Sequence, residues 1–145
     1  MSLTGGCMCG AVRYELQSDP FDAGWCHCRT CQLTSGSAAM VFASVPEGRL
    51  MWTEGIEHVR SVPSSNFGDR SFCSQCGTQL LMKLDHQPET VDFSVATLDN
   101  PNAIAPGFHI FWSQRISWFE PADELPRHEK FRPGTRGLEG TDPPR

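Results

Sequence analysis

Two short cysteine motifs, Cys7-Met8-Cys9-Gly10 and Cys73-Ser74-Gln75-Cys76-Gly77, indicate how distant parts of this chain are held together. A C-x-x-C turn points two thiolates at one metal ion, and a C-x-C pair does the same from an extended segment, because residues i and i+2 share a face. The glycine after each pair allows the chain to leave the turn with a positive φ. Each pair supplies two ligands, so the two pairs are expected to hold one tetrahedral structural zinc ion together.

A third motif, Cys26-His27-Cys28-Arg29-Thr30-Cys31, gathers three cysteines in one short segment. Such a triplet can hold a metal ion without ligands from a distant part of the chain. Catalytic zinc sites have three protein ligands and one open position. The seven cysteines therefore divide into four and three. We expect Cys26, Cys28 and Cys31 to form a catalytic zinc site, which gives two zinc ions per chain.

Other uses of the cysteines remain open from the sequence. A disulfide framework fits poorly, because the count is odd and the N-terminal residues lack the pattern of a secretory signal. Cysteines 7, 9, 73 and 76 would also accept iron, or could be buried without a metal. For the triplet, a fourth ligand from His27 or His109 would make a closed structural site. His27 is the weaker candidate, because it lies between two ligands and points away if they share a face.

Two redox interpretations of the triplet are also open. A thioredoxin-like role for Cys28 and Cys31 requires a βαβ setting, which this sequence does not indicate. A thiol redox sensor requires Cys26, Cys28 and Cys31 to be free of metal and reactive.

The rest of the chain indicates a mainly β protein with antiparallel sheets. Short apolar segments alternate with turn residues, as is typical of such folds. Val12, Tyr14 and Leu16 alternate with polar residues, the pattern of a half-buried strand. The expected strands cover residues 10–16, 38–45, 49–53, 57–62, 78–84, 91–98, 108–112 and 116–119. In the strand at 91–98, Asp92 and Ser94 are expected on the face opposite the apolar residues. One short helix is expected over residues 30–35.

Length and charge limit the organisation and the partners. The 145 residues predict a single zinc-binding β domain over residues 1–131, followed by a flexible tail rich in glycine and proline over 132–145. Twelve basic and 17 acidic residues give a net charge of −5, which argues against nucleic-acid binding. The longest apolar stretch, 38–43, is too short for a bilayer, which needs about 20 residues. Without a signal sequence, a cytoplasmic location away from membranes is expected.

The cysteine motifs and their flanks resemble the glutathione-dependent formaldehyde-activating family, also called the centromere-protein-V-like family. The resemblance rests on the segments 6–14, 26–31 with Gly36-Ser37, 70–77 with Leu80, 96–101, 109–111 with Trp118, and 123–126. It covers roughly residues 4–131. The resemblance implies a zinc-held β fold similar to that of a small guanine-nucleotide-exchange chaperone of Rab GTPases, and the same division of the cysteines. It also implies the activity of S-(hydroxymethyl)glutathione synthase, a carbon–sulfur lyase that joins formaldehyde to the glutathione thiol.

The chemistry of the triplet leads to a compatible hypothesis. Zinc held by three thiolates favours a soft anionic fourth ligand, because a coordinating thiol is deprotonated. We expect a small-molecule thiol such as glutathione to bind at Cys26, Cys28 and Cys31 and to attack a small carbonyl group, or to be released in the reverse reaction. The alternative is a non-enzymatic module in which two zinc ions stabilise a β-sheet that binds a protein partner.

Several residues outside the cysteine motifs are candidates for binding the substrate. Arg29 is the nearest candidate to hold a carboxylate, although such charges are more often simply solvated. More distant candidates are Arg13, Lys83 and Arg115. His109 is a candidate proton relay or a hydrogen-bonded histidine at a strand end. Four aromatic residues could line a pocket or belong to the core: Phe108, Phe111, Trp112 and Trp118.

Overall fold

Strand β2 (Arg13–Leu16) places Tyr14 and Leu16 in the protein interior, together with Val12 just before the strand, as their alternation predicts. In the computed structural model of the chain, which describes residues 2–133, β2 lies at the centre of a three-stranded antiparallel sheet. Its neighbours are β1 (Leu3–Gly6) and β5 (Leu50–Glu54). Most of the predicted tail, residues 134–145, lies outside the described part of the chain.

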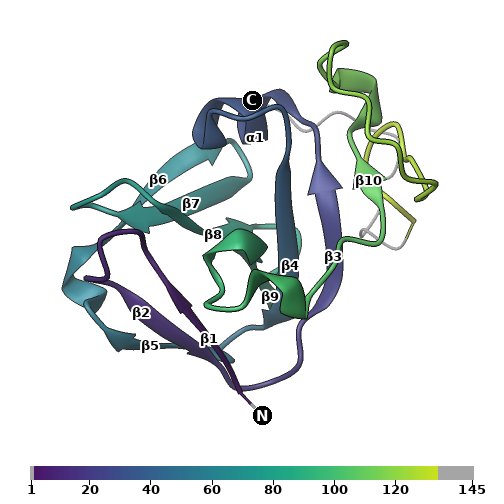
Figure 1. Cartoon of the computed structure of the whole chain (residues 1–145). Helices are drawn as coiled ribbons and strands as arrows, with labels where there is room; N and C mark the ends of the chain where they lie inside the picture. Colours follow the sequence, from purple (N-terminus) through teal and green to yellow (C-terminus); the bar gives the residue numbers. More distant parts are fainter. Residues whose placement is uncertain (1, 134–145) are drawn as a thin grey trace.

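A second, seven-stranded sheet forms the larger part of the molecule (Figure 1). Its strand order is β10-β3-β4-β9-β8-β7-β6. The strands are β3 (Phe21–Cys26), β4 (Met40–Pro46), β6 (Val59–Ser65), β7 (Gly68–Cys73), β8 (Gln79–Leu84), β9 (Thr90–Ser94) and β10 (His109–Ile110). All pairs are antiparallel except β10 with β3, which is parallel. The mainly β prediction is therefore confirmed, with a mixed second sheet.

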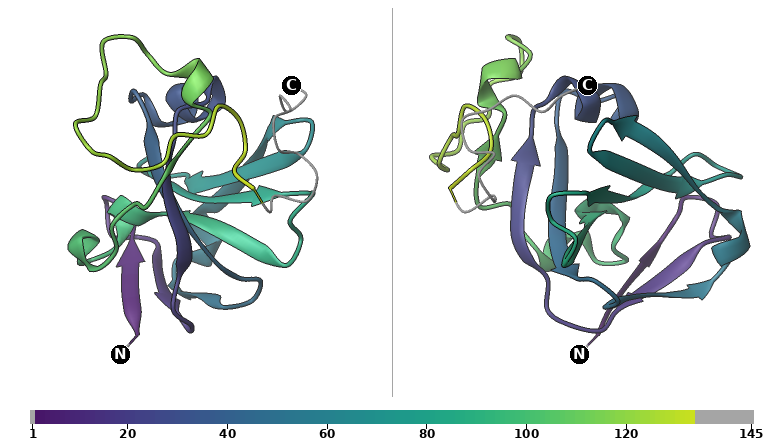
Figure 2. Two further views of the ribbon diagram at one scale, coloured as in Figure 1. Left: turned by 90° about the vertical axis from the view of Figure 1, so that its right-hand side faces the viewer. Right: turned by 180° about the vertical axis from the view of Figure 1, so that it is seen from behind.

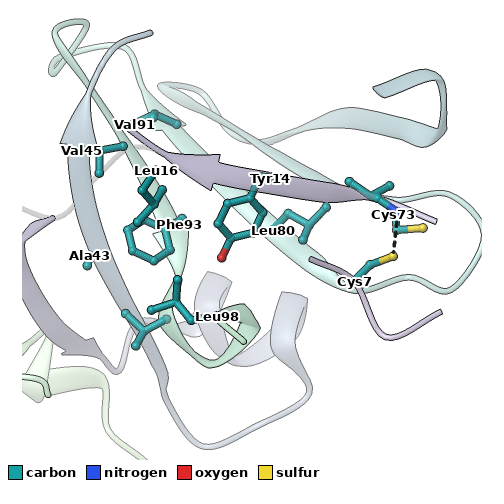
Figure 3. Close-up of a cluster of buried hydrophobic side chains, with 12 residues drawn as sticks. Cys7, Tyr14, Leu16, Ala43, Val45, Cys73, Leu80, Val91, Phe93 and Leu98 are labelled. Carbon is teal, nitrogen blue, oxygen red and sulfur yellow. Dashed lines mark hydrogen bonds between the residues drawn. The ribbon is translucent and has the colours of Figure 1, made fainter. Parts of the chain in front are cut away.

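One face of the seven-stranded sheet packs against the small sheet to form the main core. Figure 3 shows Tyr14 and Leu16 of β2 beside Phe93 of β9 and Leu80, with Cys7 and Cys73 together at one end of this core. Burying these large apolar side chains stabilises the fold by roughly 1.5–3 kcal/mol for each. The two sheets are therefore joined both by this core and by the cysteines at its end.

The opposite face of the same sheet is also buried. Asp92 and Ser94 lie on this face, opposite the apolar residues of β9 as expected, and both are buried, as is Phe42 on neighbouring β4. Strand β9 is central in the sheet, so its second face is covered as well. Its apolar neighbours on that side form a second core around Cys26 and Cys31.

The described helices are short. Helix α1 (Arg29–Ser35) confirms the predicted helix, begins at the N-cap residue Cys28 and ends at Gly36 with a left-handed φ of 66°. Single 3₁₀ turns occur at η1 (Ile56–His58), η2 (Val95–Thr97), η3 (Pro101–Ala103) and η4 (Trp112–Gln114). Within residues 2–133, no helix has the length and apolar character needed to cross a bilayer.

Three strands have no counterpart in the sequence prediction: β1, β3 and β7. The predicted strand at 116–119 is wrong, because this segment is irregular and follows η4. The segment after β10 lies at the β10 end of the sheet, on the side of β3 away from β4 (Figure 2). The helix α1 connects β3 to β4, which are antiparallel, so this unit is not the parallel βαβ unit of a thioredoxin-like motif.

Candidate metal centres and active-site cavity

The sulfurs of Cys7, Cys9, Cys73 and Cys76 all lie within 4.8 Å of one another. The Sγ atoms of Cys7 and Cys9 are 3.6 Å apart, and those of Cys9 and Cys73 are 3.9 Å apart. Four sulfurs at the usual zinc–sulfur distance of about 2.3 Å would be separated by about 3.8 Å in a tetrahedron. The four cysteines thus have the spacing of a closed metal site, as the two motifs predict.

Each cysteine pair lies in a turn that ends at a glycine. Gly10 and Gly77 have φ values of 80° and 81°, which confirms the expected left-handed exits. Gly77 N–H donates to the Cys73 carbonyl at 2.7 Å, and Gly10 N–H donates to the Cys7 carbonyl at 3.1 Å. The Cys7 pair was expected on an extended segment but forms a turn after β1. A backbone N–H, that of Val12, donates to Cys7 Sγ at 3.2 Å.

The second cluster forms where β3 ends and α1 begins. The Sγ atoms of Cys26, Cys28 and Cys31 lie within 4.8 Å of one another. Cys28 is the N-cap residue, and its sulfur accepts a hydrogen bond from Cys31 N–H at 3.3 Å. Within residues 2–133, no histidine or carboxylate belongs to this cluster. It therefore offers three ligands and no fourth.

Arg70 supplies a buried positive charge beside this cluster. The side chain is only 3% exposed, and its Nη2 donates to Cys31 Sγ at 3.2 Å. Its Nη1 donates to the Thr34 hydroxyl at 3.2 Å. A buried guanidinium requires an anionic partner, and the sulfur of Cys31 is the acceptor available to provide it. Three thiolates around a divalent ion carry a net charge of −1, which the guanidinium balances.

Without a cation, the three thiols of the second cluster would not all be deprotonated. Hydrogen bonds from Cys26 and Cys31 lower the pKa of Cys28 to about 3, while the contact with Cys28 raises the pKa of Cys26 well above its usual value. The cluster by itself therefore favours one thiolate. Three thiolates at this spacing require a cation, and a thiophilic divalent ion such as zinc matches the donor set.

Replacing Arg70 by methionine is expected to weaken metal binding at the second cluster by about 10–100-fold, because groups that hydrogen-bond to metal ligands typically contribute this much. Competition with a chromophoric chelator would measure the affinity of each site. Arg60→Met is the matched control, since Arg60 is an exposed arginine on β6. Equal metal affinity of the R70M and wild-type proteins at the second cluster would contradict this role of Arg70.

The second cluster opens into a cavity of about 160 Å³, called here the cysteine-lined cavity. Polar residues that line it besides the cysteines include Asp22, Ser44, Arg70, Asp92, Gln114 and Arg132. Its apolar lining includes Phe42, Met82, Phe108, Ile110, Phe111 and Phe131. A site of this kind, apolar with a few convergent polar groups, is typical of small-molecule binding.

Only some of the predicted substrate-binding residues line the cysteine-lined cavity. Phe108 and Phe111 line the cysteine-lined cavity, whereas Trp112 and Trp118 do not. Trp118 is largely exposed. None of the four predicted cations lines the cavity: Arg29, Arg13, Lys83 and Arg115. Arg70 lines it instead. Sequence reasoning missed Arg70 as a site residue, although it begins the segment 70–77 that carries part of the family resemblance.

These four cations have partners elsewhere. The Arg29 side chain donates to the Gln32 side chain at 3.2 Å. Arg13 pairs with Asp99, and Lys83 pairs with Glu47. Arg115 stacks over the Trp112 ring, with its guanidinium carbon 4.6 Å from the ring centroid.

His27 and His109 form a buried network behind the cluster. His27 Nε2 and His109 Nδ1 share a hydrogen bond of 2.8 Å, and His109 Nε2 lies 3.1 Å from both carboxylate oxygens of Asp123. Burial lowers the pKa of His27 to about 4. Neither histidine lines the cysteine-lined cavity. His27 points away from the cluster as expected, and His109 is a hydrogen-bonded histidine of strand β10.

Comparison with known protein families gives a match that includes both cysteine clusters. Residues 2–114 match the family model described as glutathione-dependent formaldehyde-activating enzyme. The chain belongs to this family. Both cysteine clusters, Arg70 and Asp92 lie inside the matched segment of the formaldehyde-activating family, whereas Asp123, Phe131 and Arg132 follow it.

Individual proteins are also similar to this chain. The chain is 27% identical over 127 residues to a Halomonas elongata protein named "Putative glutathione-dependent formaldehyde-activating enzyme", covering 83% of this chain and 81% of that protein. An uncharacterised lyase of Schizosaccharomyces pombe is 32% identical over 76 residues, or 52% of this chain and 53% of the lyase. A crystal structure of a Rhodobacter sphaeroides protein matches with a TM-score of 0.56 and 25% identity, covering 71% of this chain and 91% of that one.

Proposed function

We propose that this protein of the formaldehyde-activating family is a zinc-dependent enzyme that joins a thiol, with glutathione as the first candidate, to formaldehyde. In this reaction a carbon–sulfur bond forms and the thiol proton moves to the carbonyl oxygen, giving an S-hydroxymethyl adduct. The reverse reaction is a carbon–sulfur lyase reaction. The observation that carries the proposal is the three-cysteine cluster that opens into a cavity without a fourth protein ligand among the described residues.

The two cysteine clusters have different roles in this proposal. Cys26, Cys28 and Cys31 would hold the catalytic zinc, while Cys7, Cys9, Cys73 and Cys76 would hold a structural one. When bound, a zinc ion with three thiolate ligands supplies an open position that accepts a substrate thiol as its thiolate.

Other residues that line the cavity would balance the charge of the cysteine cluster and limit the access of water. Arg70 balances the negative charge of the cluster through its hydrogen bond to Cys31. Phe42, Phe108 and Phe111 line the cavity. Such apolar walls would keep water from the reacting groups, which strengthens polar interactions inside the site.

The competing function is a non-enzymatic module with two structural zinc ions. A closed second site would favour it, with a histidine as fourth ligand. The two histidines that the sequence offers as a fourth ligand are His27 and His109. They form a hydrogen bond with each other instead. The geometry thus favours the enzyme over the module.

The test is the zinc content and zinc coordination of the full chain, purified with a phosphine reductant, before and after addition of excess glutathione. We expect two zinc ions per chain and, by X-ray absorption, more sulfur ligands per zinc after glutathione is added. Acceleration of the exchange between ¹³C-formaldehyde and glutathione, measured by NMR, would complete the assignment. Two zinc ions that are indifferent to every thiol would identify a binding module, and a single zinc would leave the triplet as free thiols and favour the redox sensor.

A further inference from the structure

A row of side chains crosses the cysteine-lined cavity from strand to strand. It contains Ser44 of β4, Asp92 of β9, Met82 of β8 and Arg70 of β7, each the direct register partner of the next. All four residues line the cavity. Neighbouring strands are about 4.8 Å apart, so the Cα atoms of Asp92 and Arg70 are separated by about 10 Å. Arg70 in turn donates to Cys31 Sγ, so this row runs from Asp92 to the cysteine cluster along a cavity of about 160 Å³.

Asp92 is an unusual member of this row. It is only 5% exposed, and its Oδ1 accepts a hydrogen bond of 2.5 Å from the Ser44 hydroxyl. Within residues 2–133, no lysine or arginine forms an ion pair with it. Burial of a carboxyl group without a cationic partner is unfavourable. A carboxyl group in this position, facing a cavity that also contains a cysteine cluster, is typical of a functional acid or base.

The charged groups around Asp92 adjust its proton affinity. Burial raises the pKa of Asp92 to about 6, with the Ser44 hydrogen bond acting in the opposite direction. The charge of Asp22 raises this pKa further, whereas Arg70 and Lys83 lower it. An acid whose pKa is close to the working pH both accepts and returns a proton readily.

We propose that Asp92 is the acid–base residue of the cysteine-lined cavity, an inference that rests on the function proposed above. The Asp92 carboxylate takes the proton of the substrate thiol, and the sulfur then forms its bond with the carbonyl carbon. The carbonyl π bond breaks as the new bond forms. Protonated Asp92 returns the proton to the resulting oxyanion, which gives the S-hydroxymethyl product and restores the carboxylate. The reverse reaction moves the same proton in the opposite order, so no further reactant is required.

The test compares the zinc-loaded wild-type, D92N and D92E proteins in the ¹³C-formaldehyde and glutathione exchange measurement between pH 5 and 8. Asparagine has nearly the same shape and retains an acceptor for Ser44, but it cannot carry the proton. We expect D92N to lose about 100-fold or more of the catalysed rate, the usual size of a general acid–base contribution. The wild-type rate should rise near pH 6 as Asp92 ionises, and D92N should lack this rise. D92E should restore part of the rate and part of the pH dependence.

Asp69→Asn is the matched control, because Asp69 is an exposed carboxylate on β7 next to Arg70 in sequence. It should retain the wild-type rate and pH profile. If D92N retains both as well, while the wild-type protein binds glutathione and turns over, the role of Asp92 is overturned and the proposed function stands. If the wild-type protein itself does not accelerate exchange, the proposed function fails and the role of Asp92 fails with it.

Thermal unfolding gives a readout that does not depend on activity. Because the pKa of Asp92 is higher in the folded chain than in the unfolded chain, ionisation of this group opposes folding. The wild-type protein should therefore lose stability relative to D92N as the pH rises from about 4 to above 6, when Asp92 ionises in the fold. Parallel curves for the two proteins over this range would overturn the proposed proton exchange at Asp92.

Discussion

Replacement of Cys73 by serine is expected to leave the chain largely unfolded at room temperature. Cys73 is fully buried at the end of β7, and its sulfur joins this turn to the turn after β1. In zinc-finger peptides at pH 7 a structural zinc contributes about 10–16 kcal/mol. The net stability of a whole domain is only about 5–15 kcal/mol. Loss of even part of the zinc contribution would therefore remove the folded state.

Far-UV circular dichroism and zinc content would measure this effect. Ser74→Ala is the matched control, because Ser74 is the exposed neighbour of Cys73 in the same turn and its side chain is not a metal ligand. The control should keep the wild-type melting temperature and both zinc ions. A C73S protein that melts like the wild-type protein would show that the four-cysteine cluster does not stabilise the fold.

Replacement of Cys28 by serine is expected to have the opposite pattern, with the fold intact and the activity lost. Cys28 caps α1 through its sulfur, and serine is itself a favourable N-cap residue. The helix should therefore persist. The second cluster would retain two cysteines, and metal binding and thiol binding there should fall by more than about 100-fold, because outer partners of metal ligands alone contribute 10–100-fold.

Calorimetric titration with glutathione and zinc analysis of the C28S protein would measure these losses. The control is Leu33→Ala, which changes an exposed residue of the same helix. One zinc ion should remain, with a melting temperature close to that of the wild-type protein. Unchanged glutathione binding by C28S would place the thiol site elsewhere in the molecule and contradict the assignment of the triplet.

The features best predicted from sequence are those with a short-range physical cause. Metal-ligand motifs require fixed spacings, and the sulfurs of each cysteine group come together as the motifs predict, although the Cys7 pair lies in a turn and not on an extended segment. The buried alternation of β2 and the helix α1 are likewise local patterns. The strands missed were those with weak local signals: β1 includes Gly5-Gly6, and β7 is mostly polar. Strand preference depends more on neighbouring strands than on intrinsic propensity.

The charged residues of the cavity could not be predicted in this way, because their positions depend on contacts between distant segments. The sequence nominated Arg29 because it lies between two cysteines of the triplet, but helix geometry turns its side chain toward Gln32. Arg70 is 39 positions from Cys31 and still donates to its sulfur. Its burial depends on the packing of β7 near α1 (Figure 1).

The amino-acid sequence was therefore sufficient to predict the class of fold, the family and the two cysteine clusters that could hold a metal ion. The clusters follow from local spacing, since cysteines two or three residues apart can point at one ion in any suitable turn. That Asp92 and Arg70 face the same cavity as the triplet became visible only in the folded chain. Their positions depend on the register of four strands, and register is set by packing across the whole sheet and not by any one segment.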